Sequence, residues 1–567
     1  MRRALQAAVA TGALAAAMVP AGAWAASPNA AGNGLALRSA VGGRISHPAR
    51  LSQGLQTWLN GSLSAAARRA LAPALATKSN VDAANIGEDT ASGQSETAIA
   101  AQRGTSGRSL VMAGWNDITG ATYTDSTQLA ASLTGVGLSG DGGSSFSDLV
   151  GLPNGNPDEQ WFGDPTVASL GDGRHFVVGS LYMPSLTSCN DGLPAEGTVA
   201  VSVATVNTAG SAATFTAPVV VAPAGNLCDL LSTTPPPDIS LLDKDFLSYD
   251  PASRTLAVSY TRFFLTGIHS GLGQIEVARA HIPATPTALS AASFGMPITV
   301  WPEEQFCPAG TPSSERTQCG ADNQGAYPAV APGGDIYVAW ERNVDSNLGV
   351  SGDPYVYEHA ARIPAGSNAV AIGGPAHPVV VSAGQPHGSP DHLGVKSLDG
   401  SVIAGYSRGI GQDFPRLAFD AAAHAVVFVW NDASNHPLGD IWLRSAPAAL
   451  TTLGAVQRVN DDADFSLHFL PAVSVRSNGT ICTSWYDRRL SGPVSAVTDY
   501  YGECRPSPTS AASDFRITTA STDWLGTSSL INPNFGDYTD NATNGTTTFF
   551  TWSDGRLGIP QPFVDHR

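Results

Sequence analysis

Lysine is scarce in this chain of 567 residues, and charged residues of all kinds make up only 14% of it. The three lysines are Lys78, Lys244 and Lys396, so arginine supplies nearly all of the 30 positive charges. We therefore expect any cationic site to be a guanidinium site. The 47 Asp and Glu residues leave a net charge of −17, which argues against a nucleic-acid partner.

Long apolar runs are missing after the N-terminus. The chain begins with Arg2 and Arg3, continues with an apolar stretch over residues 4–20, and then has a small-x-small sequence at 23–25. This order is typical of a secretory signal peptide, which we place at residues 1–25. Because polar residues, Gly or Pro interrupt every later apolar run, we expect no membrane span and a secreted or periplasmic protein.

Metal-binding patterns are also missing. The six cysteines form no Cys-x-x-Cys pair, and the 12 histidines show no His-Glu-x-x-His motif, so we predict no catalytic metal and no cofactor. The acidic segment 460–464 offers oxygen ligands for a structural calcium ion, but it lacks the Gly and the terminal Glu of an EF-hand loop. We interpret it first as a solvated turn.

An even number of cysteines in an exported chain predicts disulfide bonds. Six cysteines allow 15 pairings, and we favour the one that joins sequence neighbours. It gives three bonds: Cys189–Cys228, Cys307–Cys319 and Cys482–Cys504.

A pair of β-strands joined by a Gly/Asp/Asn turn recurs seven times along the chain. The copies lie at residues 95–117, 163–182, 243–262, 326–342, 413–432, 468–489 and 534–556. The strand-end positions, Trp in five of the copies, are 55 to 90 residues apart, which is room for about four strands and their loops. The spacing predicts an all-β fold, a β-propeller with seven blades, or six if the first and last copies share a blade. We place this domain at residues 94–567, after a linker or short helical region at 26–93.

One turn carries a recognisable signature. Residues 139–146 read Ser-x-Asp-x-Gly-x-Ser-Phe, a tight turn that resembles the Asp-box. Together with phrases such as GDPTVAS, DKDFLSYD, DFPRLAFD and SWYDRR, it resembles the secreted bacterial sialidase-like (BNR, Asp-box repeat) propeller family over nearly the whole chain after residue 95. The resemblance implies a sialidase-type propeller and a carbohydrate or glycoprotein ligand.

Polar residues gather at one end of the repeated strand pairs. In an antiparallel hairpin, the start of the first strand and the end of the second lie opposite the connecting turn. The residues placed on this rim include Asp164, Arg342, Asp487, Arg488, Arg489, Asp537, Tyr538, Asp554 and Arg556. Carboxylates and guanidiniums around one opening suit a charged ligand, although blade-to-blade salt bridges would use the same residues.

The resemblance also implies roles for some of these residues. Sialidases hold the substrate carboxylate with three arginines, use a tyrosine as nucleophile and an aspartate as acid/base. By rim position, the arginines would be Arg342, Arg489 and Arg556, the nucleophile Tyr538 and the acid Asp164, with Arg488, Asp487, Asp537 and Asp554 as further substrate contacts. We expect a sialidase-like glycoside hydrolase acting on an anionic glycan. The alternative is a propeller that binds glycan or protein without catalysis.

Overall fold

The computed structural model describes residues 80–83, 94–117, 132–155, 159–185, 196–267, 270–303, 321–344, 355–382, 414–432, 439–462, 466–491, 497–527 and 536–567. This part of the chain consists of β-strands, loops and three short 3-10 helices: η4 (Leu227–Leu231), η6 (Pro286–Ala288) and η7 (Ala291–Ser293). Within it, no helix has the length and apolar character that a membrane crossing requires. The predicted signal peptide lies outside the described residues.

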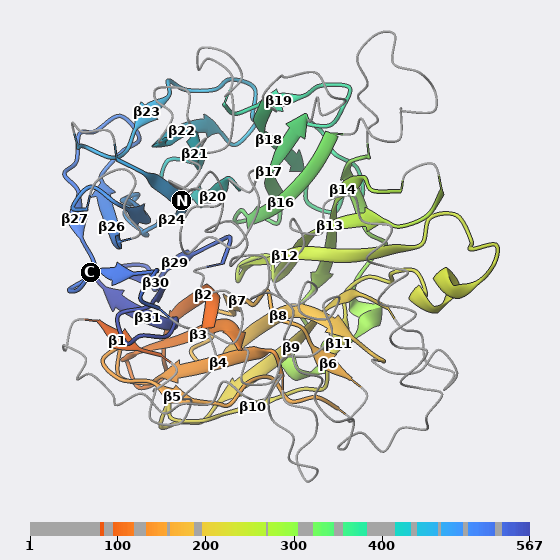
Figure 1. The fold of residues 1–567 in the computed structure, drawn as a ribbon, viewed down its shortest axis with the longest axis horizontal. Helices are drawn as coiled ribbons and strands as arrows, with labels where there is room; N and C mark the ends of the chain where they lie inside the picture. Colours follow the sequence, from red (N-terminus) through yellow and green to blue (C-terminus); the bar gives the residue numbers. More distant parts are fainter. Residues whose placement is uncertain are drawn as a thin grey trace, which may run out of the picture.

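Seven antiparallel sheets stand around one axis (Figure 1). Their innermost strands, which define blades 1 to 7, are β2 (Gln94–Arg103), β7 (Thr166–Ser169), β12 (Ser240–Asp250), β16 (Ala321–Val330), β20 (Arg416–Asp420), β24 (His468–Val475) and β29 (Asp540–Thr543). Each contacts the next, and β29 contacts β2, so the ring is closed. The predicted seven-bladed β-propeller is confirmed, and the six-bladed alternative is wrong.

From its innermost strand, each blade runs outward as an up-and-down meander. The second strands are β3 (Ser109–Asp117), β8 (His175–Met183), β13 (Thr255–Phe264), β17 (Ile336–Val344), β21 (Ala425–Asp432), β25 (Ile481–Asp487) and β30 (Thr548–Asp554). The third strands are β4 (Thr134–Ser139), β9 (Thr198–Val206), β14 (Gly273–His281), β18 (Tyr355–Ile363), β22 (Asp440–Pro447), β26 (Val497–Arg505) and β31 (Gln561–His566).

Short strands complete the blades. The outer ones are β5 (Ser147–Asp148), β10 (Ala213–Phe215), β11 (Val219–Val220), β15 (Ile298–Trp301), β19 (Val379–Val380), β23 (Gln457–Arg458), β27 (Phe515–Arg516) and β28 (Thr522–Asp523), while β6 (Gln160–Trp161) pairs with β8 beside β7. The outer edge of blade 7 is β1 (Val81–Asp82), which pairs with β31. The N-terminal and C-terminal parts of the propeller thus share one sheet, and this sheet closes the ring.

Both faces of the blades are buried because each blade packs between two others. The strand-end tryptophans Trp115, Trp340, Trp430, Trp485 and Trp552 are at most 1% exposed. The repeated aromatic position is therefore part of the core. The position recurs along the sequence because each blade has its own buried layer of side chains.

One predicted disulfide bond is confirmed. Cys482 in β25 and Cys504 in β26 face each other across the sheet of blade 6 and are bonded at 2.05 Å. Cys228 is also disulfide-bonded, but its predicted partner Cys189 lies outside the described residues, as do Cys307 and Cys319.

A repeated irregularity directs side chains to the axis. The register of β2, β12, β16 and β24 with their neighbours shifts near the start of each strand. The residues within the shifts have positive φ angles of 53° to 66°: Glu96, Lys244, Gly325 and Leu470. Such bulges bend a strand and re-aim its side chains. In β2 and β12 the bulge residue is charged, Glu96 or Lys244, and both side chains lie beside Asp164.

Candidate functional site

Five charged side chains meet where the innermost strands begin, and we call them the axial cluster: Glu96, Asp164, Lys244, Asp245 and Asp537. Lys244 Nζ lies 2.6 Å from Asp537 Oδ2 and 3.7 Å from Asp164 Oδ2. Because Lys244 belongs to blade 3 and Asp537 to blade 7, which are not neighbours, their ion pair crosses the axis. All five residues are fully buried.

Burial sets the protonation of the axial cluster. It raises the pKa of Asp164 to about 7 against the opposing charge of Lys244, and the charges of Asp243 and Asp537 add to the rise. Burial, with the charge of Asp243, also raises the pKa of Asp245 well above its ordinary value. Near neutral pH, Asp164 can therefore give or take a proton, as a general acid or base must.

Asn116, at the end of β3, fixes two members of the cluster. Its side-chain nitrogen donates to Glu96 Oε2 at 2.5 Å, and its oxygen accepts from the backbone N–H of Asp164 at 2.6 Å. Gly536 lies against the same glutamate with φ of +80°, and a Cβ at this position would stand 2.1 Å from Glu96 Cγ. The geometry of the cluster thus requires glycine at 536.

Tyr538 lies beside the axial cluster and is buried. Its hydroxyl donates to the carbonyl of Pro165 at 3.2 Å, and its ring packs edge-on against Phe246. Burial raises the pKa of Tyr538 well above its ordinary value, and the nearby charges of Asp164 and Glu96 add to this. The structure thus brings together Tyr538, Asp164 and Asp537, three of the residues predicted from rim position.

A second polar layer lies next to Tyr538. The guanidinium of Arg416 is 4.4 Å from the ring of Phe246, 4.7 Å from that of Tyr327 and 5.6 Å from that of Tyr538. Tyr327 donates to Asp540 Oδ1 at 3.3 Å, and burial raises the pKa of Asp540 to about 6. Arg416 is 2% exposed, and within the described chain its Nε and Nη1 have no hydrogen-bond acceptor.

The arginines predicted to hold a substrate carboxylate have other neighbours. Arg489 contacts four carboxylates at 2.7 to 3.5 Å: Asp461, Asp462, Asp487 and Asp514. Trp485 donates its indole N–H to Asp487 Oδ2 at 2.9 Å, and the guanidinium stacks on Tyr501. These contacts tie blade 6 to the segment that follows blade 5.

Blade 7 repeats this arrangement. Arg556 pairs with Asp554 Oδ2 at 2.6 Å, and Trp552 donates to the same oxygen at 2.7 Å. Arg556 also donates to Thr519 Oγ1 in the neighbouring blade and stacks on the ring of Phe563. The Trp-x-Asp-x-Arg pattern therefore forms a unit within a blade.

The two remaining arginines lie on other aromatic rings. Arg488 is buried, donates to Thr498 Oγ1 at 3.0 Å and lies over Phe469. Arg342 lies over Trp301 at 5.8 Å, between blades 3 and 4. Across the described ranges, no group of three or more His, Cys, Asp or Glu side chains has the arrangement of a metal site, and residues 463 and 464 of the calcium candidate lie outside them.

Four residues of the site were not predicted from the sequence: Glu96, Asn116, Asp245 and Arg416. Lys244 was expected on the rim, but without a role. A usable signal was the alignment of the repeats: Glu96, Asp164 and Lys244 are each the second residue of their copy, and Asp537 follows Gly536 as Asp164 follows Gly163. Charged residues at one position of a repeat that faces an axis are brought together by the closure of the ring.

No family model matches the chain, and no curated protein matches it. Solved structures give distant matches. An α-L-arabinofuranosidase from Fusarium graminearum with an iminosugar inhibitor is 10% identical with a TM-score of 0.37, over 86% of this chain and 97% of that one.

A Hadza microbial sialidase is 7% identical with a TM-score of 0.39, over 72% of this chain and 65% of that one. A polysaccharide lyase is 9% identical with a TM-score of 0.38, over 70% and 75%. At such values the similarity identifies neither a substrate nor a catalytic residue.

Proposed function

We propose that this protein is an exported glycoside hydrolase whose acid is Asp164 and whose site is the axial cluster. The main support for the proposal is Asp164, a carboxyl group with a pKa of about 7. It shares the ammonium of Lys244 with a second carboxylate, Asp537. Glycoside hydrolysis needs one carboxyl group that donates a proton to the leaving oxygen and an anionic group that stabilises the positive charge of the sugar.

Asp537 supplies the anionic group in this proposal. Its ion pair with Lys244 at 2.6 Å favours the carboxylate form, whereas Asp164 lies farther from the same ammonium. Tyr538 stays the predicted nucleophile from the sialidase resemblance. Since its pKa is raised, it would need a neighbouring carboxylate such as Glu96 to accept its proton as it attacks.

The excess of carboxyl groups in the axial cluster affects which substrates can bind there. The axial cluster holds four carboxyl groups and one ammonium, that of Lys244, while Arg489 and Arg556 pair with carboxylates of blades 6 and 7. A substrate carboxylate would meet repulsion at this position. We therefore favour a sugar without a carboxylate over the anionic glycan that the resemblance implies.

The test is turnover of aryl arabinofuranosides, aryl hexosides, aryl uronides and a sialoside by the wild type and by Asp164→Asn, Asp537→Asn and Tyr538→Phe. We expect Asp164→Asn to lower kcat about 10²- to 10⁴-fold on a poor leaving group. The loss should be much smaller on dinitrophenolate, which needs no proton. The basic limb of the wild-type pH profile, where Asp164 loses its proton near pH 7, should be absent from this variant.

Unchanged kcat in Asp164→Asn would rule out the proposed acid. The second candidate, a glycan-binding propeller without catalysis, is favoured by the full burial of the axial side chains. Glycan binding without turnover of any substrate in the panel would support it.

A further inference from the structure

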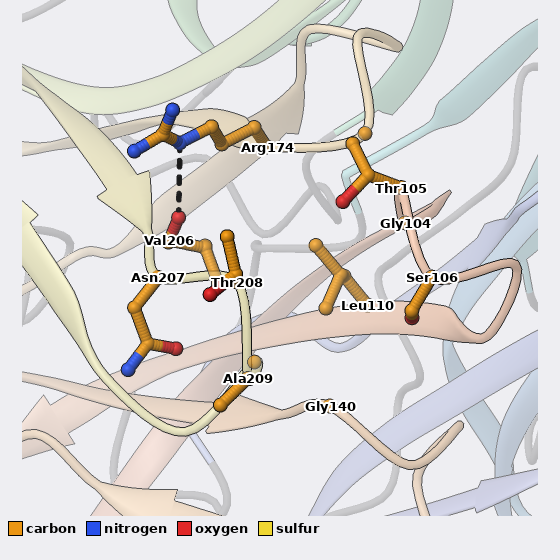
Figure 2. A pocket seen from close by; sticks show the side chains of 12 residues that line it. Gly104, Thr105, Ser106, Leu110, Gly140, Arg174, Val206, Asn207, Thr208 and Ala209 are labelled. Atoms are coloured by element: carbon orange, nitrogen blue, oxygen red, sulfur yellow. Dashed lines mark hydrogen bonds between the residues drawn. The ribbon is translucent and has the colours of Figure 1, made fainter.

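A shallow crevice with a volume of about 20 Å³ opens between blades 1 and 2 on the rim that carries the hairpin turns, opposite the axial cluster. Its lining comes from four turns and one core residue: Gly104–Ser106, Gly140, Gly173–Arg174, Val206–Gly210 and Leu110. Figure 2 shows Arg174 and the hydroxyls of Thr105 and Thr208 around this turn-side crevice, with Leu110 between Thr208 and Ser106.

A hydrogen bond along one edge of its guanidinium orients the side chain of Arg174. Its Nε donates to the carbonyl of Val206 at 3.2 Å, and its backbone N–H donates to Asp172 Oδ1 at 2.9 Å. Its two terminal nitrogens have no partner among the residues that the structure describes. The side chain thus presents an oriented pair of donors at an exposed site, which is the geometry that suits an oxyanion.

The walls of the crevice are close-packed backbone. A Cβ on Gly140 would stand 2.6 Å from the carbonyl oxygen of Gly210, so the end of β4 and the β9–β10 turn touch directly. On the other side, Gln102 joins the two hairpin turns, accepting from the N–H of Gly173 and donating to the carbonyl of His175. A site framed in this way needs little rearrangement on binding.

The charged residue in the lining of the crevice is Arg174, a cation in a protein of net charge −17. Two acids are sequence neighbours of lining residues, and both already accept several hydrogen bonds. Asp141 accepts from Ser139, Ser144 and Ser145, and Asp172 from Arg174 and His175.

The crevice offers mainly hydrogen-bond donors to a ligand. Arginine N–H groups and the hydroxyls of Thr105, Ser106 and Thr208 donate hydrogen bonds, while the neighbouring carboxylates are satisfied within their own turns. We propose that the turn-side crevice binds an oxyanion group, a sulfate ester or carboxylate, carried by an acidic polysaccharide. The protein would then hold a charged chain at a place remote from the axial cluster.

The test is binding of the full chain to dextran sulfate, polygalacturonate and uncharged dextran at several salt concentrations. Arg174→Gln is the test variant, and Arg254→Gln, in the β12–β13 turn on the same rim, is the matched control. Loss of a charge-assisted pair should weaken binding of the preferred acidic polymer about tenfold or more in Arg174→Gln. Arg254→Gln should bind like the wild type, and inorganic sulfate should compete in the wild type but not in Arg174→Gln.

A preference for dextran sulfate would assign a sulfate ester to the crevice, and a preference for polygalacturonate a carboxylate. Equal weakening by the two substitutions would mean binding to general surface charge and would overturn the proposal. Wild-type affinity in Arg174→Gln, or equal binding of uncharged dextran, would also overturn it. Matching melting temperatures of the three proteins establish that the variants are folded.

Discussion

At the scale of single residues, Gly536 determines whether the axial cluster can form. Its φ is +80°, and a Cβ at this position would lie only 2.1 Å from Glu96 Cγ, so there is no room for a side chain. We expect Gly536→Ala to lower the free energy of unfolding by about 2–4 kcal/mol, from backbone strain and overpacking together. Urea denaturation followed by tryptophan fluorescence measures the change.

Gly366→Ala is the matched control for this substitution. Gly366 also has a positive φ, +70°, but a Cβ there would meet no atom within 4 Å. Its replacement introduces backbone strain alone, for which we expect a loss of about 1 kcal/mol. Equal losses in the two variants would mean that contact with Glu96 is not what requires glycine at 536.

Substitution of Asp487 tests whether this residue contacts a ligand or stabilises the fold. It is fully buried, accepts from the indole of Trp485 and pairs with Arg489 at 2.7 Å. We expect Asp487→Asn to lower the free energy of unfolding by about 2 kcal/mol, because a buried charge pair loses one partner. Chemical denaturation tests this, with Asp461→Asn, which removes an exposed partner of Arg489, as the milder control. Full stability of Asp487→Asn would instead favour the substrate contact predicted from rim position.

At the scale of elements, the start of β24 carries a histidine that links blades 5 and 6. His468 is buried, with Nδ1 2.9 Å from the carbonyl oxygen of Gly439 and Nε2 3.1 Å from Asp462 Oδ1. Although burial opposes it, hydrogen bonding to Asp462 and the charges of Asp487 and Asp462 raise the pKa of His468 above its ordinary value of 6.5. The contacts between blades 5 and 6 therefore stabilise the protonated form of His468.

The sign of the pH dependence follows from this raised pKa. The stabilisation is complete below pH 6.5, where the unfolded chain is protonated too, and is lost as the pH rises through the folded-state pKa. We expect the wild type to lose more unfolding free energy than His468→Gln between pH 6 and pH 8. Asp164 and Asp514, whose pKa values are also raised, titrate in both proteins, so the difference isolates His468. Parallel profiles would contradict the assignment.

Elements of this fold can be predicted from the sequence because each blade is built from local signals. A strand pair, its turn and its terminal Trp occupy about 20 neighbouring residues, and the pattern recurs often enough to count the blades. The axial cluster is indicated only by a charged residue at a similar position in four repeats, and no single repeat shows what that residue contacts. Glu96 and Asp537 are far apart in the chain, and they become neighbours only because the last blade closes against the first.

The arginines show a second limit of sequence reasoning. The pattern Trp-x-Asp-x-Arg is equally consistent with a guanidinium that faces a ligand and with one that pairs within its own blade. The aromatic rings beneath Arg489 and Arg556 come from the third strands, β26 and β31. That contact depends on side-chain packing between strands, which the spacing of residues in one strand does not encode.

At the scale of the whole molecule, the closed ring depends on a two-residue strand that precedes all seven repeats. In β1, Val81 pairs with Val564, and the preceding Asn80 donates to Asp565 and to the carbonyl of Ile517 while accepting from Thr519. These bonds connect blade 7 to blade 6 as well as to the N-terminal segment. Without β1, the edge of β31 would be unpaired at the point where the ring joins.

Deletion of residues 26–93 should therefore destabilise the entire propeller, whereas deletion of 26–75, which keeps β1, should not. We expect the longer deletion to lower the melting temperature by several degrees and to broaden the transition, because blades 6 and 7 lose their common partner. Differential scanning calorimetry measures both quantities. Asn80→Ala should reproduce part of the effect through its lost hydrogen bonds, about 1–3 kcal/mol. If the two deletions melt alike, the ring is closed by the contacts of the innermost strands β29 and β2 alone.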